Sequence, residues 1–436
     1  MPRALPAIDP APPLVRSRVP LAGAGLALLA DPTAAFERWR RELGDTFAVD
    51  VFGYRMLCVF SPEGVRNLWA LPEAQASKGA GDFALLRHKV PDELFVGRRT
   101  RPHDLFARDD VEVYLENLRA AVAIELDELD DAGELELFAW TRRLMHRVGL
   151  ASWGGIEAAA PRHLDRLVPL LDRLDSSESF VHPHKALWAM ATRKRAERRA
   201  IAGLDRVFAD ILAERARAGG DARDDLLAQI AAKWADVPSP ERERGIGRDV
   251  VLVHMGAQSN LFAATAWTLV HLLERPALLA AVRGGDLDLL DRCSYESIRL
   301  RQRSIVLRMV LRETTIADEK AAYRVAPGAF LATTMAVTNP AALPGLDRFD
   351  PAHFERRAFA RAGELPAREL VTTFGHGRHA CPAHGFSIAA MRHAIASLVE
   401  RFELEPLFRD PRPLRRQIGG VARADRPCRV RYAARR

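Results

Sequence analysis

The stretch Phe374-Gly-His-Gly-Arg-His-Ala-Cys381-Pro-Ala-His-Gly-Phe386 decides the fold, and it lies directly before a predicted amphipathic helix over residues 386–402. A thiolate at Cys381 would face the N-terminal end of that helix, where unpaired N–H groups and the helix dipole favour negative charge. Glycines such as Gly375 let the backbone turn tightly and approach a flat ligand. An anionic sulfur held among amide donors is what an iron–thiolate site requires.

Two other interpretations of this stretch stay open from the residues alone. Cys381 could be a buried structural cysteine in a glycine-rich loop. It could also bind zinc together with the nearby histidines His376, His379 and His384. Their spacing differs from the paired motifs of structural zinc sites, so the stretch favours the iron–thiolate interpretation.

The composition is that of an ordinary globular enzyme. The chain has 436 residues, of which 48% are hydrophobic and 28% charged. Its four cysteines form no CxxC pair and no disulfide framework, so we expect a reducing, cytoplasmic compartment. The net charge is +7, but the basic clusters carry no interleaved aromatic residues, so we expect no nucleic-acid partner. The clusters predict either solvated helix faces or a docking surface for an acidic redox protein.

One segment, residues 250–273, is long enough to cross a bilayer and contains no Asp, Glu, Lys or Arg. Its middle reads His254-Met-Gly-Ala-Gln-Ser-Asn260. Polar groups at mid-membrane depth are costly without partners. We therefore expect a helix buried in the centre of a large protein, and no membrane association.

The chain reads as mostly helical with a minor β region. Residues 1–20 are expected to be an irregular arm, and residues 21–436 one large domain. Residues 47–51 and 56–60 alternate around a turn as a hairpin would. Other predicted elements are helices over 249–274 and 287–301, and short strands over 306–311 and 329–336.

The cysteine stretch resembles the haem-binding signature of the cytochrome P450 family, Phe-x-x-Gly-x-x-x-Cys followed by a small residue. Phe374, Gly377 and Cys381 match that signature, while Ala383 stands where the family usually has Gly. The resemblance implies a cytochrome P450 fold and haem b, with Cys381 as the axial iron ligand. The haem contacts it implies beside the cysteine are Phe374, Gly375, Arg378, His379 and Ala383.

Further residues extend the resemblance over nearly the whole chain. Glu296 and Arg299 resemble the family's Glu-x-x-Arg helix, whose buried pair ties the core to the haem loop, and His353 takes the place of the usual third partner. Arg308 matches the position that often binds a haem propionate. His103, which stands near Arg108 with an offset of one residue, is a weaker match to another propionate contact.

The long central helix departs from the family pattern. Gly256-Ala-Gln-Ser-Asn260 aligns with the usual Gly-x-Asp/Glu-Thr run, so Ser259 replaces the acid and Asn260 the alcohol of the proton relay. We expect Gln258, Ser259 and Asn260 to be the catalytic polar groups. The chain could be a monooxygenase that takes protons through water or substrate. It could instead rearrange a peroxide, as prostacyclin synthase does, or transfer a nitrene from an N–O substrate, or be a degenerate haem-binding protein.

The substrate is expected to be a small organic molecule of bacterial secondary metabolism. The resemblance implies substrate contacts from Met255, Gly256, Leu261, Ile305 and Val306, although ordinary core packing is an equal alternative for each. It also implies a ferredoxin-type redox partner. We expect a monomer.

Overall fold

The structure is a computed structural model that describes residues 5–17, 22–100, 105–106, 111–175, 183–219, 224–361 and 363–435. The predicted architecture, mainly α with a minor β region, is confirmed. The chain divides into two compact units: residues 1–87, 295–380 and 413–423 form unit 1, and residues 88–294, 381–412 and 424–436 form unit 2. Each unit is described by itself.

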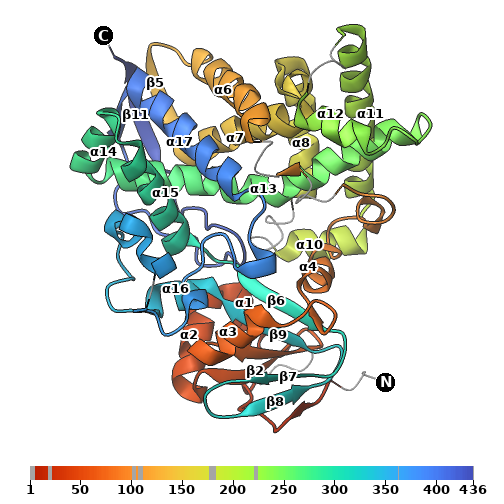
Figure 1. Ribbon diagram of the computed structural model, residues 1–436, viewed down its shortest axis with the longest axis vertical. Helices are drawn as coiled ribbons and strands as arrows, with labels where there is room; N and C mark the ends of the chain where they lie inside the picture. Colours follow the sequence, from red (N-terminus) through yellow and green to blue (C-terminus); the bar gives the residue numbers. More distant parts are fainter. Residues whose placement is uncertain are drawn as a thin grey trace. The chain divides into compact units, whose positions relative to one another are not determined.

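Unit 1 is built on a five-stranded sheet with the strand order β2-β3-β9-β6-β4 (Figure 1). A smaller sheet has the order β1-β8-β7. Its strands are β1 (Ile8–Asp9), β2 (Thr46–Val51), β3 (Tyr54–Val59), β4 (Ala76–Ser77), β6 (Ile305–Val310), β7 (Thr314–Ala317), β8 (Ala322–Val325) and β9 (Phe330–Thr334). Its helices are α1 (Gly25–Ala30), α2 (Pro32–Leu43), α3 (Pro62–Ala70), α4 (Lys78–Leu86), α16 (Met335–Ala341), η5 (Pro351–Arg361), η6 (Arg368–Leu370) and η7 (Gly377–His379).

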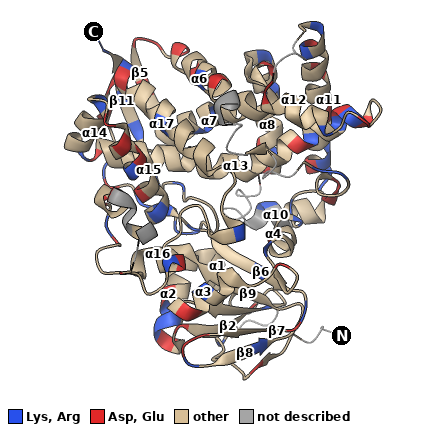
Figure 2. Ribbon diagram, viewed as in Figure 1, with Lys and Arg blue, Asp and Glu red and all other residues tan. Residues whose placement is uncertain are grey.

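Unit 2 is helical around the 33-residue helix α13 (Glu241–Leu273), which packs against α7, α11, α12 and α17. Most of α13 is tan in Figure 2, because residues 250–273 contain no Lys, Arg, Asp or Glu. The other helices are η1 (Asp92–Leu94), α6 (Val111–Asp127), α7 (Leu137–Gly154), η3 (Ile156–Ala159), α8 (Pro161–Leu174), α10 (Pro183–Ala191), α11 (Arg195–Arg217), α12 (Leu226–Ala232), α14 (Pro276–Arg283) and α17 (His384–Arg401). Its strands β5 (Ala132–Glu136), β10 (Phe402–Pro406) and β11 (Arg429–Ala434) form a sheet in the order β10-β11-β5. Helix α15 (Leu287–Arg301) belongs to unit 2 up to residue 294 and to unit 1 beyond it.

Local sequence signals account for these elements well. The hairpin β2–β3 forms as predicted and turns at Phe52-Gly53, where both residues have positive φ, 47° and 82°. Such a turn matches the right-handed twist of the flanking strands. Helix α15 has the predicted bounds. Among the residues described, no helix is long and apolar enough to span a bilayer.

Several boundaries differ from the predictions, and β6 for example spans residues 305–310 instead of 306–311. The central helix begins at Glu241, eight residues before the predicted start, because its polar first turns carry no apolar periodicity. The strand predicted over 329–336 ends at Thr334, since Met335 begins α16. The helix predicted over 386–402 runs from His384 to Arg401, and Phe402 begins β10. Within the arm predicted as irregular, Ile8–Asp9 pair with β8.

Candidate functional site

The sulfur of Cys381 lies just before helix α17, as the sequence predicts. Ala383 is the N-cap residue of that helix, and its backbone N–H donates a hydrogen bond to the Cys381 sulfur. Cys381 is half-buried and forms no disulfide. Burial raises the pKa of the thiol more than the Ala383 amide lowers it. The protein surroundings by themselves therefore disfavour the thiolate that the sequence predicts at this position.

The loop before the cysteine needs its glycines. Gly375 has a φ of 82° and Gly377 a φ of 56°, a region that disfavours side chains. A Cβ on Gly375 would collide with the carbonyl oxygen of His379. A Cβ on Gly377 would meet no atom within 4 Å, so open space adjoins the backbone there. The close approach of a flat ligand to this loop stays a prediction.

The aromatic and basic residues of the loop have different surroundings. Phe374 packs edge-on against Tyr295, with ring centroids 6.0 Å apart. Arg378 is exposed. The ring of His376 lies edge-on to Trp69 with its Nε2 atom 2.9 Å from the Thr372 hydroxyl, so it is tied to its own loop. No three metal-ligating side chains cluster among the residues described, and the zinc alternative has no support there.

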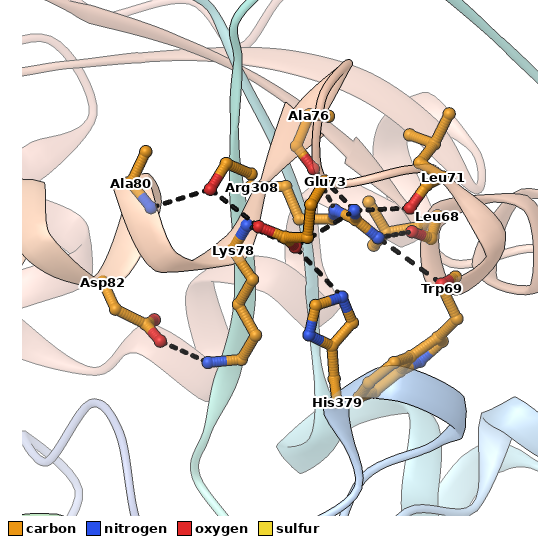
Figure 3. A network of polar contacts seen from close by, with 11 residues as sticks. Leu68, Trp69, Leu71, Glu73, Ala76, Lys78, Ala80, Asp82, Arg308 and His379 are labelled. Carbon is orange, nitrogen blue, oxygen red and sulfur yellow. Dashed lines mark hydrogen bonds and ion pairs between the residues drawn. The ribbon is translucent and has the colours of Figure 1, made fainter. Parts of the chain in front are cut away.

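Arg308 and His379 come together around Glu73 (Figure 3). The Arg308 side chain is fully buried. Its guanidinium donates to backbone carbonyls near the end of α3 and in β4, those of Leu68 at 2.9 Å and Ala76 at 2.8 Å among them, and to the carbonyl of Leu71 in the turn after α3. Arg308 therefore fastens β6 to this turn as well as facing Glu73.

His379, which the resemblance implies as a haem contact, is not a cation. Its Nε2 atom lies 3.2 Å from the Glu73 carboxylate. Burial and the charge of Arg308 lower the pKa of His379 below its ordinary value, more than Glu73 raises it. The imidazole is therefore neutral at pH 7 and can act only as a hydrogen-bond donor or acceptor.

The predicted trio of Glu296, Arg299 and His353 is brought together in unit 1. Arg299 and Glu296 are buried and make a bidentate pair, with Nε–Oε2 2.7 Å and Nη2–Oε1 2.6 Å. The Nδ1 atom of His353 lies 2.9 Å from Glu296 Oε1. Arg299 also donates to the carbonyl oxygen of Leu346 at 2.7 Å, so the pair joins α15 to the segment after α16.

The predicted catalytic residues of α13 do not share one environment. Ser259 and Asn260 are half-buried and Gly256 is exposed, whereas every residue from 261 to 273 is buried. A Cβ on Gly256 would meet no atom within 4 Å. Helix α13 therefore leaves this short polar stretch beside open space. Gln258 differs, because it is buried and its Nε2 donates to the Arg142 carbonyl oxygen of α7 at 3.1 Å.

The predicted substrate contacts also lie in different surroundings. Met255 is half-buried beside Gly256 on the open stretch, whereas Leu261 is buried. Val306 belongs to the apolar core of unit 1, and Ile305 packs against a neighbouring part of that core. Core packing, the alternative to substrate contact that the sequence left open, therefore accounts for the position of Val306. His103 lies outside the described residues.

Sequence reasoning missed a buried polar chain between α7 and α13. The Nδ1 atom of His146 lies 2.8 Å from His254 Nε2, and Trp153 Nε1 donates to His254 Nδ1 at 3.3 Å. The other ring nitrogen of His146 lies 3.3 Å from the Asp172 carboxylate. Burial lowers the pKa of His254 well below its ordinary value, so it is neutral. The only sign of this chain in the sequence was His254, a histidine inside a segment without charged residues.

Each unit, taken by itself, holds groups whose chemistry suits a haem: unit 2 holds Cys381, and unit 1 holds the loop before it together with Arg308. Cys381 offers a sulfur ligand that accepts an amide hydrogen bond, and the Gly377 backbone is open. Arg308 and His379 are the groups that would face propionate carboxylates. Glu73 was not foreseen there, because nothing in its local sequence marks it.

Comparison with known proteins identifies the family. The profile described as cytochrome P450 matches residues 192–431, more than half of the chain. The sterol 14-demethylase of Arabidopsis thaliana is 22% identical over 90% of this chain and 86% of its own length. The 24-hydroxycholesterol 7-alpha-hydroxylase of Mus musculus is 21% identical, covering 97% and 93%. Abscisic acid 8'-hydroxylase 2 of Oryza sativa subsp. indica is 24% identical, covering 88% and 80%. The chain therefore belongs to the cytochrome P450 family and is an oxidoreductase that uses haem b.

Proposed function

We propose that this enzyme is a monooxygenase that oxidises a small, largely apolar molecule of bacterial secondary metabolism, with electrons from a ferredoxin-type partner. The relatives named above are hydroxylases and a demethylase, and two of them bear sterol names. The observation that carries the proposal is the pair Ser259 and Asn260, which are half-buried near the exposed Gly256, in a helix whose residues 261–273 are all buried. Bound haem b supplies the redox chemistry that activates dioxygen.

The residues of this chain have separate tasks in that reaction. Cys381 would hold the iron, and the Ala383 amide would moderate the charge on its sulfur. Asn260 would orient a polar group of the substrate or a water molecule through its side-chain amide. Ser259 would exchange a proton with water through its hydroxyl. No carboxylate lies within residues 250–273 to relay protons directly.

A second candidate follows from the same two residues. Because Ser259 and Asn260 replace the acid and alcohol of the usual relay, the enzyme could act on a substrate that already carries a weak O–O or N–O bond. Such a reaction, a peroxide rearrangement or a nitrene transfer, needs no electrons from outside.

Turnover experiments separate the two candidates. A monooxygenase consumes reduced nicotinamide through the redox partner in proportion to product. The second candidate predicts turnover of a peroxide or N–O substrate without any electron donor, and fully coupled hydroxylation would contradict it. Asn260→Ala should lower turnover by about 10- to 100-fold if Asn260 positions a reacting group. Haem content should stay unchanged, and an equal loss of both would make Asn260 structural.

We further propose that the enzyme is a cytoplasmic monomer. All four cysteines are free thiols, which fits a reducing compartment. Cell fractionation tests the location, and light scattering of the purified holoenzyme tests the oligomeric state.

A further inference from the structure

In unit 1, Glu73 lies beside the side chains to which a haem propionate would be expected to bind. Its Oε1 atom lies 3.2 Å from His379 Nε2 and 3.4 Å from Arg308 Nη2 (Figure 3). Arg308 matches the position that often binds a haem propionate, and His379 is one of the haem contacts that the resemblance implies. One protein carboxylate therefore already engages both groups.

The position of Glu73 is fixed by further donors. Its Oε1 accepts a hydrogen bond from the Lys78 backbone N–H at 3.0 Å, and its Oε2 accepts one from the Ser77 hydroxyl at 2.7 Å. Burial alone would raise the pKa of Glu73, but these hydrogen bonds and the nearby His379 and Arg308 lower it below its ordinary value. Glu73 is thus an ionised carboxylate, and with 41% of its side chain exposed it remains accessible.

A haem propionate and the Glu73 side chain are the same kind of chemical group. Both are singly charged carboxylates that seek the same donors. The buried Arg308 donates to backbone carbonyls from all three of its nitrogens: Nε and Nη2 to Ala76, Nη1 to Leu68 and Nη2 also to Leu71. Glu73 adds a charge-to-charge attraction to these neutral acceptors, with its Oε1 atom 3.4 Å from Nη2. Two carboxylates that share one cation repel each other, and each weakens the binding of the other.

We propose that Glu73 competes with a haem propionate for Arg308 and His379, and so weakens the binding of haem to this chain. This inference rests on the haem site assigned above, because it concerns the same two side chains. The simpler alternative is that Glu73 only caps the start of α4 through Ser77 and Lys78. A capping role affects folding, but it does not depend on whether the bound porphyrin carries charged carboxylates.

The experiment compares two porphyrins on two proteins. Iron protoporphyrin IX and its dimethyl ester, which lacks the propionate charges, are titrated into the wild-type chain and into Glu73→Gln. Competition predicts that Glu73→Gln tightens the binding of the free acid by roughly tenfold and leaves the ester within about twofold, since the repulsion is partly screened at this exposed site. The readout is the ratio of the two dissociation constants, not catalytic activity.

Two further variants serve as controls for this experiment. Asp82→Asn removes a charge from the same network. Asp82 makes its ion pair with Lys78 and acts on His379 only through its charge, so the ratio for Asp82→Asn should stay much nearer to the wild type than that for Glu73→Gln. Glu73→Asp keeps the charge and should also resemble the wild type. If Glu73→Gln unfolds, Glu73→Asp and Glu73→Ser supply the comparison between a charged and a neutral side chain.

The outcomes distinguish the proposals. An unchanged ratio in Glu73→Gln, or a loss of free-acid binding relative to the ester, overturns the competition. If the wild-type chain binds neither porphyrin, or binds both without Cys381, the haem site itself is refuted. Thiolate ligation in both porphyrin complexes, together with an unchanged ratio, refutes the competition alone.

Discussion

Replacing Arg299 by Met tests how much the buried ion pair of α15 stabilises the protein. The change removes the bidentate partner of Glu296 while keeping an apolar side chain of similar length. Glu296 is fully buried and keeps only the Asp350 backbone N–H at 3.1 Å and the His353 imidazole at 2.9 Å. The carboxylate is then a buried charge without a full counter-charge.

The expected magnitude follows from this geometry. Breaking a buried, hydrogen-bonded pair by removing one partner costs about 3–5 kcal/mol, because the remaining charge is left uncompensated. Arg299→Met also leaves the carbonyl oxygen of Leu346 without its donor. We therefore expect the free energy of unfolding to fall by about 4 kcal/mol.

The same helix offers a matched control. Arg292 pairs with Asp288 at 3.0 Å, but the Asp288 side chain is 85% exposed. Exposed pairs of this spacing contribute about 0.3–0.5 kcal/mol, so Arg292→Met should change stability by less than about 1 kcal/mol. The double variant Glu296→Leu with Arg299→Met should recover part of the loss, since it removes the stranded charge.

Urea unfolding followed by circular dichroism measures all four proteins under one set of conditions. Near-equal losses in Arg299→Met and Arg292→Met would refute the reasoning, because burial would then have no effect on the value of the pair. A double variant less stable than Arg299→Met would also contradict the assignment of the loss to an unpaired carboxylate.

Three other predictions concern single side chains. Gly375→Ala should lower the free energy of unfolding by more than about 1 kcal/mol, because the φ of Gly375 is 82° and the new Cβ would collide with the His379 carbonyl. Gly256→Ala should raise it by about 0.5–1 kcal/mol, since the new Cβ meets no atom within 4 Å and alanine favours the helix. Thermal melts of the two variants test both expectations. Because the folded chain holds the pKa of His254 below its ordinary value, the unfolded chain binds the proton first, so stability is fully present above about pH 6.5 and falls as the pH drops below it. Urea unfolding from pH 7 to pH 5 should show this loss, and a flatter profile is expected for His254→Gln. Cys381→Ser should abolish the carbon monoxide difference spectrum typical of thiolate ligation, and an unchanged spectrum would show that another residue holds the iron.

The linear sequence determined those features whose cause is local. Glycines, a cysteine and a following amphipathic helix mark the loop from Phe374 to Cys381, and α17 does begin directly after it, with Ala383 as its N-cap residue. The hairpin around Phe52 and the bounds of α15 follow from alternation and periodicity in short windows. The departure of Ser259 and Asn260 from the usual relay is likewise visible without coordinates.

Only the tertiary structure decided which side chains meet across the chain. Glu73 reaches His379 over 306 positions of sequence, and no local pattern marks that encounter. Gln258 was expected to be catalytic, but its amide bonds to α7. His254 finds His146 and Trp153 on another helix. The physical reason is that a buried polar group must be paired, while the choice of partner depends on how helices and strands pack.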